Sequence, residues 1–295
     1  MEEYLRNFLE MFDYPEASRP VLCDAYTRIC NDARWGERYQ DLMRRYAGNK
    51  DCDYKLLAED MAEISQAAGI HRYTGQLLMY ICLSRQLREF YREAGIAESV
   101  WHDSMMDLKY KLLECKAVYG IWGTFTNWFD KFFTLNRFAM GRLQYEMSTL
   151  NRDYSKHGVT LNPQSKVLGV HIPRTLTRLD RQSVEASFAQ ADRFFRDWFA
   201  GEPTVFACGS WLLFPRHRQM LPPESNIVGF MDRFDIIDHG FNKDYSEVWR
   251  LFDCLYTPEL DKMPQDSTLR RAYVDLMRRG EKTGWGFGVC VYSGC

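Results

Sequence analysis

Apolar residues recur three and four positions apart through the first part of the chain, which is the spacing of one buried face of an α-helix. Four such sets are present, and each predicts one amphipathic helix. The sets are Leu22, Tyr26, Ile29 and Ala33; Leu57, Met61, Ile64 and Ala68; Tyr80, Leu83, Leu87 and Phe90; and Met105, Leu108, Leu112, Cys115 and Tyr119.

Residues that favour helix ends stand at the borders of these sets. Glycine followed by an apolar residue is typical of a left-handed helix stop, whereas Asp, Thr and Ser favour the N-cap position and proline favours the first turn. The predicted stops are Gly69 and Gly95, the predicted N-caps are Asp53, Thr74 and Ser99, and Pro20 follows Ser18 at a predicted helix start. Two of the ten prolines precede residue 163, so residues 1–120 are predicted to form an all-α bundle and residues 121–295 a second domain.

The pattern changes to that of strands after residue 120. Residues 142–147 alternate strictly, which places Arg142, Gln144 and Glu146 on one face of a predicted strand. Residues 167–173 form a nearly continuous apolar run that ends at proline, as expected of a strand covered on both faces.

A polar loop at residues 174–179 leads to Asp180, a predicted N-cap, and to a helix with apolar residues between Val184 and Trp198. A second apolar run, 205–213, completes a strand-loop-helix-strand unit, which predicts two parallel strands with a right-handed crossover. Ligands collect at the carboxyl ends of such strands, where the helix N-terminus offers N–H groups to an anion.

The last third predicts a short amphipathic stretch at 227–234, a strand at 235–238, a helix at 268–279 and a glycine-rich strand at 286–292. The expected fold class is therefore α+β. A helical bundle is followed by an α/β domain with a mixed, centrally parallel sheet.

Charge and composition exclude several classes of protein. The formal net charge of −2 lacks the basic excess of a nucleic-acid binder, and the acidic start and the lack of an 18-residue apolar run predict a cytoplasmic chain without a membrane span. The nine cysteines, which include Cys295, lack a two-residue spacing and predict no metal or redox site. His217 and His239 likewise do not stand at metal-ligand spacing from a Cys or a carboxylate, so no metal site is predicted there.

Four sequence segments resemble a bacterial family of acyltransferase-domain proteins, which have a helical N-acyltransferase N-terminal domain and a GNAT-like C-terminal domain. The segments are GRLQYE at 141–146, LGVHIP at 168–173, SWLL at 210–213 and LPPESNI at 221–227. The resemblance covers nearly the whole chain.

The resemblance implies an acyl-CoA-dependent N-acyltransferase whose helical domain shapes the pocket for an amine acceptor, either a small molecule or a peptide. In this superfamily two parallel strands splay apart, the pantetheine of acyl-CoA lies in the gap, and the pyrophosphate lies on the following loop. The positions implied for acyl-CoA are Val170, His171, Ile172, Arg174, Thr175, Arg178 and Asp180. The loop lacks the usual glycines, so Arg174 and Arg178 would supply charge-assisted contacts.

The candidate catalytic residues are His171, Glu146 and Ser210. His171 is a candidate general base with a suitable ordinary pKa, and a buried structural histidine is the alternative. Glu146 is a candidate second base or half of an ion pair with Arg142. Ser210 is a candidate hydrogen-bond donor or acid for the leaving thiolate, and Tyr292 is another acid on fold analogy.

Other interpretations of the sequence stay open. A non-catalytic binding protein could retain the architecture, and a hydrolase could use Cys208 with His171, although a buried cysteine is commonly inert. The aromatic residues between Trp122 and Phe133 predict a helix at a domain interface, and a stacking platform for sugars or bases is the alternative.

Overall fold

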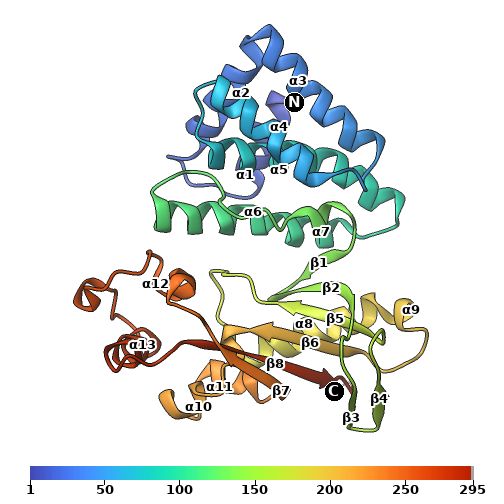
Figure 1. The fold of residues 1–295 in the computed structure, drawn as a ribbon. Coiled ribbons are helices and arrows are strands. Elements are labelled where there is room, and N and C mark those ends of the chain that lie inside the picture. Colours follow the sequence, from blue (N-terminus) through green and yellow to red (C-terminus); the bar gives the residue numbers. More distant parts are fainter. Residues whose placement is uncertain (294–295) are drawn as a thin grey trace. The chain divides into compact units, whose positions relative to one another are not determined.

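In the computed structural model of the protein, residues 1–293 are described, and Cys295 lies outside them. The chain divides into two compact units, which are a helical unit, Met1–Phe138, and an α/β unit that begins at Ala139 (Figure 1). The sequence boundary was expected between residues 120 and 121. The fold class is the expected one, a helical part followed by an α/β part with a mixed sheet.

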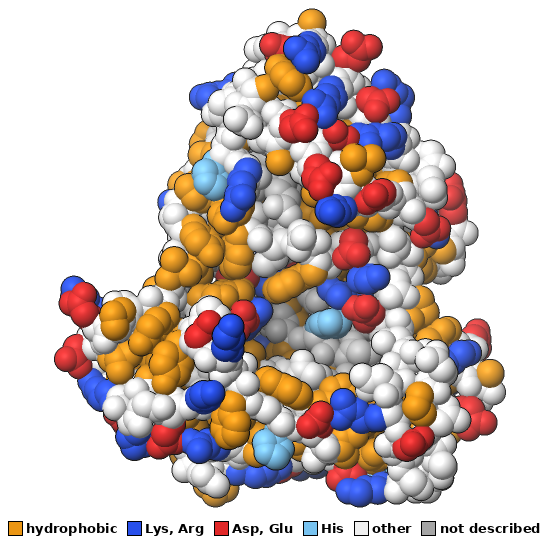
Figure 2. Space-filling view, viewed as in Figure 1, with side chains coloured by type: hydrophobic (Ala, Val, Ile, Leu, Met, Phe, Trp, Pro, Cys, Tyr) orange, Lys and Arg blue, Asp and Glu red, His pale blue; other side chains and the backbone are white. Residues whose placement is uncertain are grey.

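Seven helices build the helical unit. They are α1 (Glu2–Met11), α2 (Arg19–Asn31), α3 (Ala33–Gly48), α4 (Tyr54–Ala67), α5 (Arg72–Glu93), α6 (Glu98–Tyr119) and the short α7 (Asp130–Phe133). The core of this unit includes Leu22, Leu57, Leu87 and Leu108, and α5 is buried on all sides from Leu77 to Ser84. On the visible face of this unit, basic and acidic side chains are interspersed (Figure 2).

The helix ends follow the sequence signals in part. The Asp53 carboxylate accepts hydrogen bonds from the backbone of Lys55 and Leu56, and Gly69 and Gly95 adopt the expected positive φ of 65° and 70°. The predictions at Thr74 and Ser99 are wrong. Helix α5 begins at Arg72, where the side chain of His71 caps it, and α6 begins at Glu98.

The hydroxyl of Thr74 has another role, which is to hold the segment Trp122–Asn127 against α5. It donates to the Trp122 carbonyl at 2.9 Å, and the Thr124 N–H donates to the Tyr73 carbonyl at 3.0 Å. Gln76 Nε2 donates to the Thr126 carbonyl at 3.0 Å. The helix expected over these aromatic residues is therefore wrong except at α7, because the segment bonds to α5, and the bonds within it join Thr124 to Thr126 and not successive helical turns.

Gly123 allows this close approach. A Cβ atom at residue 123 would lie 2.3 Å from the backbone carbon of Tyr73. We expect Gly123→Ala to lower the free energy of unfolding by about 1–3 kcal/mol, because the backbone of α5 must shift to accommodate the methyl group. Urea unfolding would measure it. Gly48→Ala is the matched control, since nothing lies within 4 Å of its Cβ position, and an equal loss in both variants would contradict this explanation.

A six-stranded mixed sheet organises the α/β unit, in the order β1-β2-β5-β6-β8-β7. Its strands are β1 (Arg137–Met140), which spans the boundary between the units, β2 (Leu143–Thr149), β5 (Lys166–His171), β6 (Val205–Ser210), β7 (Asp235–Phe241) and β8 (Gly284–Val291). β5 and β6 are parallel, as expected, and the pairs β2-β5, β6-β8 and β8-β7 are antiparallel.

One face of this sheet is covered by α8 (Arg181–Phe194), on which Phe188 stacks against Phe206 of β6 at 4.2 Å between ring centroids. Near the start of β5 and β6, the other face packs against the two-stranded hairpin of β3 (Tyr154–Lys156) and β4 (Val159–Leu161). The hairpin was not predicted. Its signal is His157-Gly158, which both adopt positive φ, as a type I′ turn requires.

The remaining elements are short, apart from α13 (Thr268–Arg278), which lies in an apolar cluster with Phe214 and Phe252. They are α9 (Arg196–Phe199), α10 (His217–Met220), α11 (Asn226–Met231), α12 (Trp249–Phe252) and the 3₁₀ turns η1 (Trp211–Leu213), η2 (Ser246–Val248) and η3 (Leu260–Lys262). The edge strand β7 has a register shift between Ile236 and Asp238. Arg152 and Tyr154 bond to β7 through Asp238 and Asp235, at 2.9 and 3.1 Å.

Candidate active site

The parallel pairing of β5 with β6 ends before either strand does. Its register contains the pairs Leu168–Phe206 and Gly169–Ala207. Both strands continue beyond these pairs, β5 to His171 and β6 to Ser210. β5 meanwhile stays paired with β2 as far as His171, opposite Gln144. The carboxyl ends of β5 and β6 therefore leave a gap in the centre of the sheet. The gap lies between the β2–β5 pair and the β6–β8 pair.

Register decides which side chains share a face at this gap. Residues directly opposite one another in a sheet lie on the same face, and residues two apart along a strand do so too. Gln144 lies opposite His171, Glu146 lies opposite Gly169, and Gly169 lies opposite Ala207. These five residues therefore lie on one face, the face that α8 does not cover.

Glu146 and His171 form the polar centre of that face. Glu146 Oε2 lies 3.0 Å from His171 Nε2, and the two side chains are 20% and 43% exposed. Gly169 lies beneath the pair, since a Cβ at this position would be 3.7 Å from Glu146 Cβ and 4.0 Å from His171 Nε2. The sequence placed Glu146 and His171 on different strands, and the register brings them together.

This contact determines what the imidazole can do. With Nε2–H donating to the carboxylate, the neutral ring keeps its lone pair on Nδ1, so Nδ1 is the nitrogen that can accept a proton. Protonation then produces an imidazolium beside a carboxylate, which stabilises the charge. The pair is therefore a candidate general base in which Glu146 orients His171.

Ser210 and Cys208 lie on the opposite face from His171. Ala207 shares the face of His171, so alternation places Cys208 and Ser210 on the side of α8. The Ser210 hydroxyl accepts a hydrogen bond from the Leu212 backbone at 3.1 Å and caps the turn η1. Burial raises the pKa of the Cys208 thiol to about 12. The alternative of a hydrolase that uses Cys208 with His171 is therefore excluded, because the sheet separates the two side chains. The strand predicted over 205–213 ends at Ser210.

Tyr292 also lies on the helix-covered side. Its ring contacts Phe188 and Phe206, with centroids 6.1 and 5.8 Å away, and the residue is buried. The sheet therefore separates it from the pair of Glu146 and His171.

The loop after β5 carries Arg174 and Thr175. Arg174 Nη2 donates to Asp253 Oδ2 at 2.6 Å, and the same oxygen accepts from Arg270 at 2.5 Å. The hydroxyls of Thr175 and Thr177 lie 2.9 Å apart. Asp253, which sequence reasoning missed, thus holds Arg174 toward α12, and no local motif signalled this contact.

Asp180 occupies the N-cap of α8, as predicted. Its carboxylate accepts from the Ser183 N–H at 2.8 Å. Hydrogen bonds from the Ser183 backbone and hydroxyl lower the pKa of this carboxyl group. A carboxylate cannot donate to a phosphate, so its role at this helix start is structural. Arg178, two residues earlier, is exposed.

His217 is completely buried in the α/β unit, in α10, which follows β6 and the turn η1. Its Nδ1 lies 3.2 Å from the Leu212 carbonyl and its Nε2 lies 2.8 Å from the Tyr273 hydroxyl. Burial lowers the pKa of this histidine to about 4. Within residues 1–293, no group of three or more His, Cys, Asp or Glu side chains is placed to hold a metal ion. No helix in the same range is long and apolar enough to cross a bilayer.

Two protein families together account for nearly the whole chain. Residues 3–135 match the family described as N-acyltransferase N-terminal domain, and residues 137–290 match the family described as GNAT-like C-terminal domain. No curated protein matches the chain.

Solved structures with the same fold include three acyltransferase complexes. An acyltransferase mutant with octanoyl-CoA is 21% identical, with a TM-score of 0.75 over 98% of this chain and 88% of that one. A complex with decanoyl-CoA and teicoplanin is 21% identical, with a TM-score of 0.73 over 97% and 87%. A complex with decanoyl-CoA alone is 22% identical, with a TM-score of 0.73 over 97% and 86%. At these identities the likeness shows a shared fold.

Proposed function

Because the chain belongs to the family with a GNAT-like C-terminal domain, here preceded by an N-acyltransferase N-terminal domain, we propose that it transfers an acyl group from acyl-CoA to an amine. The acceptor is an amine on a small molecule or peptide. The observation that carries this proposal is the gap between β5 and β6, where the parallel register stops at Gly169–Ala207 and both strands continue. Unpaired backbone groups on β5 would there bind the amide groups of the pantetheine.

The fold neighbours support an acyl-CoA donor. Two of them are complexes with octanoyl-CoA and with decanoyl-CoA. For this chain the donor is proposed as an acyl-CoA, and the neighbours make eight- and ten-carbon chains the first to test.

His171 is the proposed general base. The acceptor amine attacks the thioester carbonyl carbon, the new C–N bond forms, and the C–S bond breaks as CoA thiolate leaves. The proton lost by the amine passes to His171 Nδ1, while Glu146 holds Nε2–H at 3.0 Å and stabilises the resulting imidazolium. Neither residue forms a covalent intermediate in this sequence of steps.

The N-terminus of α8 and Arg178 are the proposed binding groups for the pyrophosphate. A 14-residue helix presents backbone N–H groups and a positive dipole end to an anion. Arg174 contributes only if it exchanges Asp253 for a phosphate oxygen, since the carboxylate now engages its guanidinium. The carboxylate of Asp180 opposes the anion, so the proposed site excludes it.

A second candidate function rests on that same loop. Arg174 is committed to Asp253, and residues 174–179 contain no glycine to bring backbone N–H groups round a pyrophosphate. These two features favour a binding protein that retained the fold and lost catalysis. An acyltransferase should be stabilised by acyl-CoA and should release free CoA, whereas this binding protein should do neither.

Thermal unfolding with acetyl-, octanoyl- and decanoyl-CoA tests the donor. We expect stabilisation that depends on chain length, because a ligand at 100 times its Kd raises the free energy of unfolding by about 2.7 kcal/mol. Release of free CoA in the presence of amines would then test turnover. Arg178→Ala should weaken binding of CoA, whereas Arg34→Ala, an exposed arginine of the helical unit, is the matched control. Unchanged melting at millimolar CoA would refute the donor site and favour the binding protein.

A further inference from the structure

The loop after β5 begins with an arginine whose guanidinium is held by a carboxylate of the same unit. Asp253, the residue at which α12 ends, forms a two-pronged ion pair with Arg174. Arg174 Nη2 donates to Oδ2 at 2.6 Å, and Nη1 contacts Oδ1. A guanidinium binds carboxylate and phosphate with the same fork of two N–H groups. Asp253 therefore uses the binding capacity that Arg174 would offer to a phosphate.

Asp253 also has a second cation, which stays with it if Arg174 changes partner. Arg270 Nη2 donates to Asp253 Oδ2 at 2.5 Å, and the Arg270 side chain is 15% exposed. Arg270 is itself fixed, because its Nε donates to the Leu251 carbonyl at 2.9 Å and its Nη1 bonds to Asp266 at 2.9 and 3.0 Å. Departure of Arg174 therefore leaves the Asp253 carboxylate paired, which avoids the cost of isolating a charge that is largely buried.

Arg174 can change partner by rotation of its side chain. That side chain is 47% exposed, against 20% for Asp253. The backbone beside it is held, because the Pro173 carbonyl accepts from Arg142 Nη1 at 2.9 Å and from the Thr175 N–H at 3.0 Å. Exposed side chains change rotamer quickly, whereas loops rearrange more slowly. The start of the loop can therefore stay in place while the guanidinium turns from the carboxylate to a bound anion.

We propose that Asp253 sets the affinity of the protein for its acyl donor by competing with the donor's pyrophosphate for Arg174. This inference rests on the acyl-CoA site proposed above. In the free protein the carboxylate binds the guanidinium. In the complex a phosphate oxygen binds it, and Arg270 remains the partner of Asp253. Because Arg174 must first leave the carboxylate, the apparent affinity for the donor is lower than the affinity of molecules in which the guanidinium is already released.

Titration calorimetry of the full chain with CoA tests this competition. Asp253→Asn removes the charge, and asparagine tolerates the left-handed conformation of residue 253, whose φ is 60°. We expect this variant to bind CoA about three- to tenfold more tightly than the wild-type protein. Asp253→Gly also keeps the left-handed helix end and should show the same gain. The gain should disappear when Arg174→Gln is added, since the released guanidinium causes it.

Asp266→Asn is the matched control for charge. Asp266 bonds to Nη1 of Arg270, so this variant removes an equal charge from the same cluster while Asp253 keeps Arg174. Its affinity for CoA should stay within about twofold of the wild-type value. Equal gains in Asp266→Asn and Asp253→Asn would overturn the proposal, as would a gain that persists with Arg174→Gln. Circular dichroism would confirm the folding of each variant.

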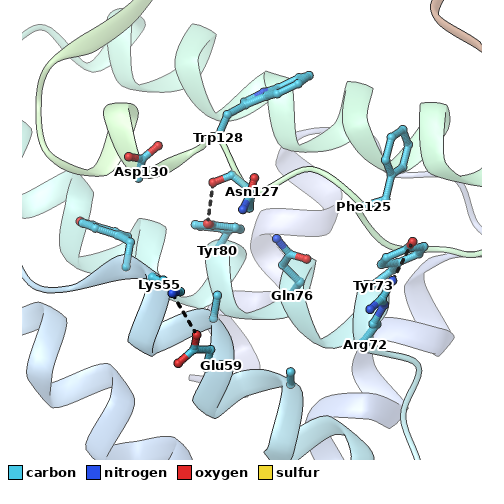
Figure 3. A pocket seen from close by; sticks show the side chains of 13 residues that line it. Lys55, Glu59, Arg72, Tyr73, Gln76, Tyr80, Phe125, Asn127, Trp128 and Asp130 are labelled. Atoms are coloured by element: carbon cyan, nitrogen blue, oxygen red, sulfur yellow. Dashed lines mark hydrogen bonds and ion pairs between the residues drawn. The ribbon is translucent and has the colours of Figure 1, made fainter. Parts of the chain in front are cut away.

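A pocket in the helical unit is the alternative place for the phosphate groups. It has a volume of about 650 Å³, and its lining contains two cations, Lys55 and Arg72, and two carboxylates (Figure 3). Because these charges balance, we expect the pocket to attract no polyanion, and Arg72→Gln should bind CoA as the wild-type protein does. A loss of affinity in Arg72→Gln, with none in Arg174→Gln, would overturn the proposal.

The same titrations separate this proposal from the proposed function. If neither the wild-type protein nor Asp253→Asn binds millimolar CoA, the donor site is refuted and the competition with it. If both bind CoA with equal affinity, the donor site stands and the competition alone is refuted. Binding that is tighter in Asp253→Asn, and only while Arg174 is present, supports both.

Discussion

The His171→Ala variant is expected to transfer the acyl group about 10²- to 10⁴-fold more slowly than the wild-type protein, with the loss in kcat. The imidazole touches the reacting amine only as its proton leaves, so the affinity for acyl-CoA should change little. Steady-state release of CoA, with donor binding measured separately, gives the two quantities. A fall in donor affinity with unchanged kcat would contradict a role as general base.

Glu146 acts through His171, so its variants should change the rate of transfer and leave the affinity for acyl-CoA unchanged. Glu146→Gln keeps a partner near Nε2 but removes the charge that stabilises the imidazolium. Its kcat should therefore fall, by less than that of His171→Ala, and steady-state release of CoA measures this loss. Cys208→Ser is the matched control, because this thiol lies on the other face of the sheet, and an equal loss of kcat in a folded Cys208→Ser variant would contradict the role of Glu146.

Below pH 6.5, the α/β unit should lose about 3 kcal/mol of stability through His217 alone, most of it by pH 4. Its pKa falls from 6.5 to about 4 because burial disfavours the charged ring. A difference of one in pKa between the folded and unfolded chain corresponds to about 1.4 kcal/mol. The folded pKa is the lower one, so the unfolded chain binds the proton first as the pH falls through this window, and stability is fully present only above pH 6.5.

The geometry explains why His217 resists protonation. Nδ1–H donates to the Leu212 carbonyl, so Nε2 accepts from the Tyr273 hydroxyl, and both nitrogens of the neutral ring are satisfied. A second proton on Nε2 would face that hydroxyl donor. The rings of Trp211 and Phe214 surround the imidazole with apolar surface.

Urea unfolding between pH 7 and pH 4 measures the effect. His217→Gln should be less stable at pH 7 but should show a shallower loss on acidification, by up to about 1.4 kcal/mol per pH unit. His239→Gln, an exposed position on β7, should retain the wild-type slope. If the free energy of unfolding fell equally with pH in the wild-type protein and in His217→Gln, carboxyl groups alone would cause the loss of stability in acid.

Local signals in the sequence predicted much of this fold. Asp53 and Asp180 cap the helices that they were expected to cap, because a carboxylate beside free backbone N–H groups is a contact between near neighbours. The parallel strands β5 and β6 followed from two apolar runs that flank an amphipathic helix. The N-cap predicted at Thr74 was wrong, because its hydroxyl donates to the carbonyl of Trp122, 48 residues away.

The candidate active site was predicted in part for a related reason. Alternation along β2 placed Glu146 on an open polar face, and the apolar run over 167–173 placed His171 within a buried strand, which in the structure ends at that residue. Whether the two meet depends on the register between β2 and β5, and whether Ser210 joins them depends on the register between β5 and β6. Register is a property of pairs of strands, so neither segment carries it alone. The contact between Asp253 and Arg174 could not be predicted either, because it joins residues 79 positions apart and depends on the tertiary structure.

The irregular edge strand β7 has a consequence for how the protein behaves at high concentration. An exposed sheet edge can recruit a strand from another molecule and so begin aggregation. The register shift between Ile236 and Asp238 interrupts the row of backbone groups that an incoming strand would pair with. Asp235 and Asp238 lie on each side of this break and are ion-paired with Lys156 and Arg152, so charged side chains flank the edge that an incoming strand would have to cover.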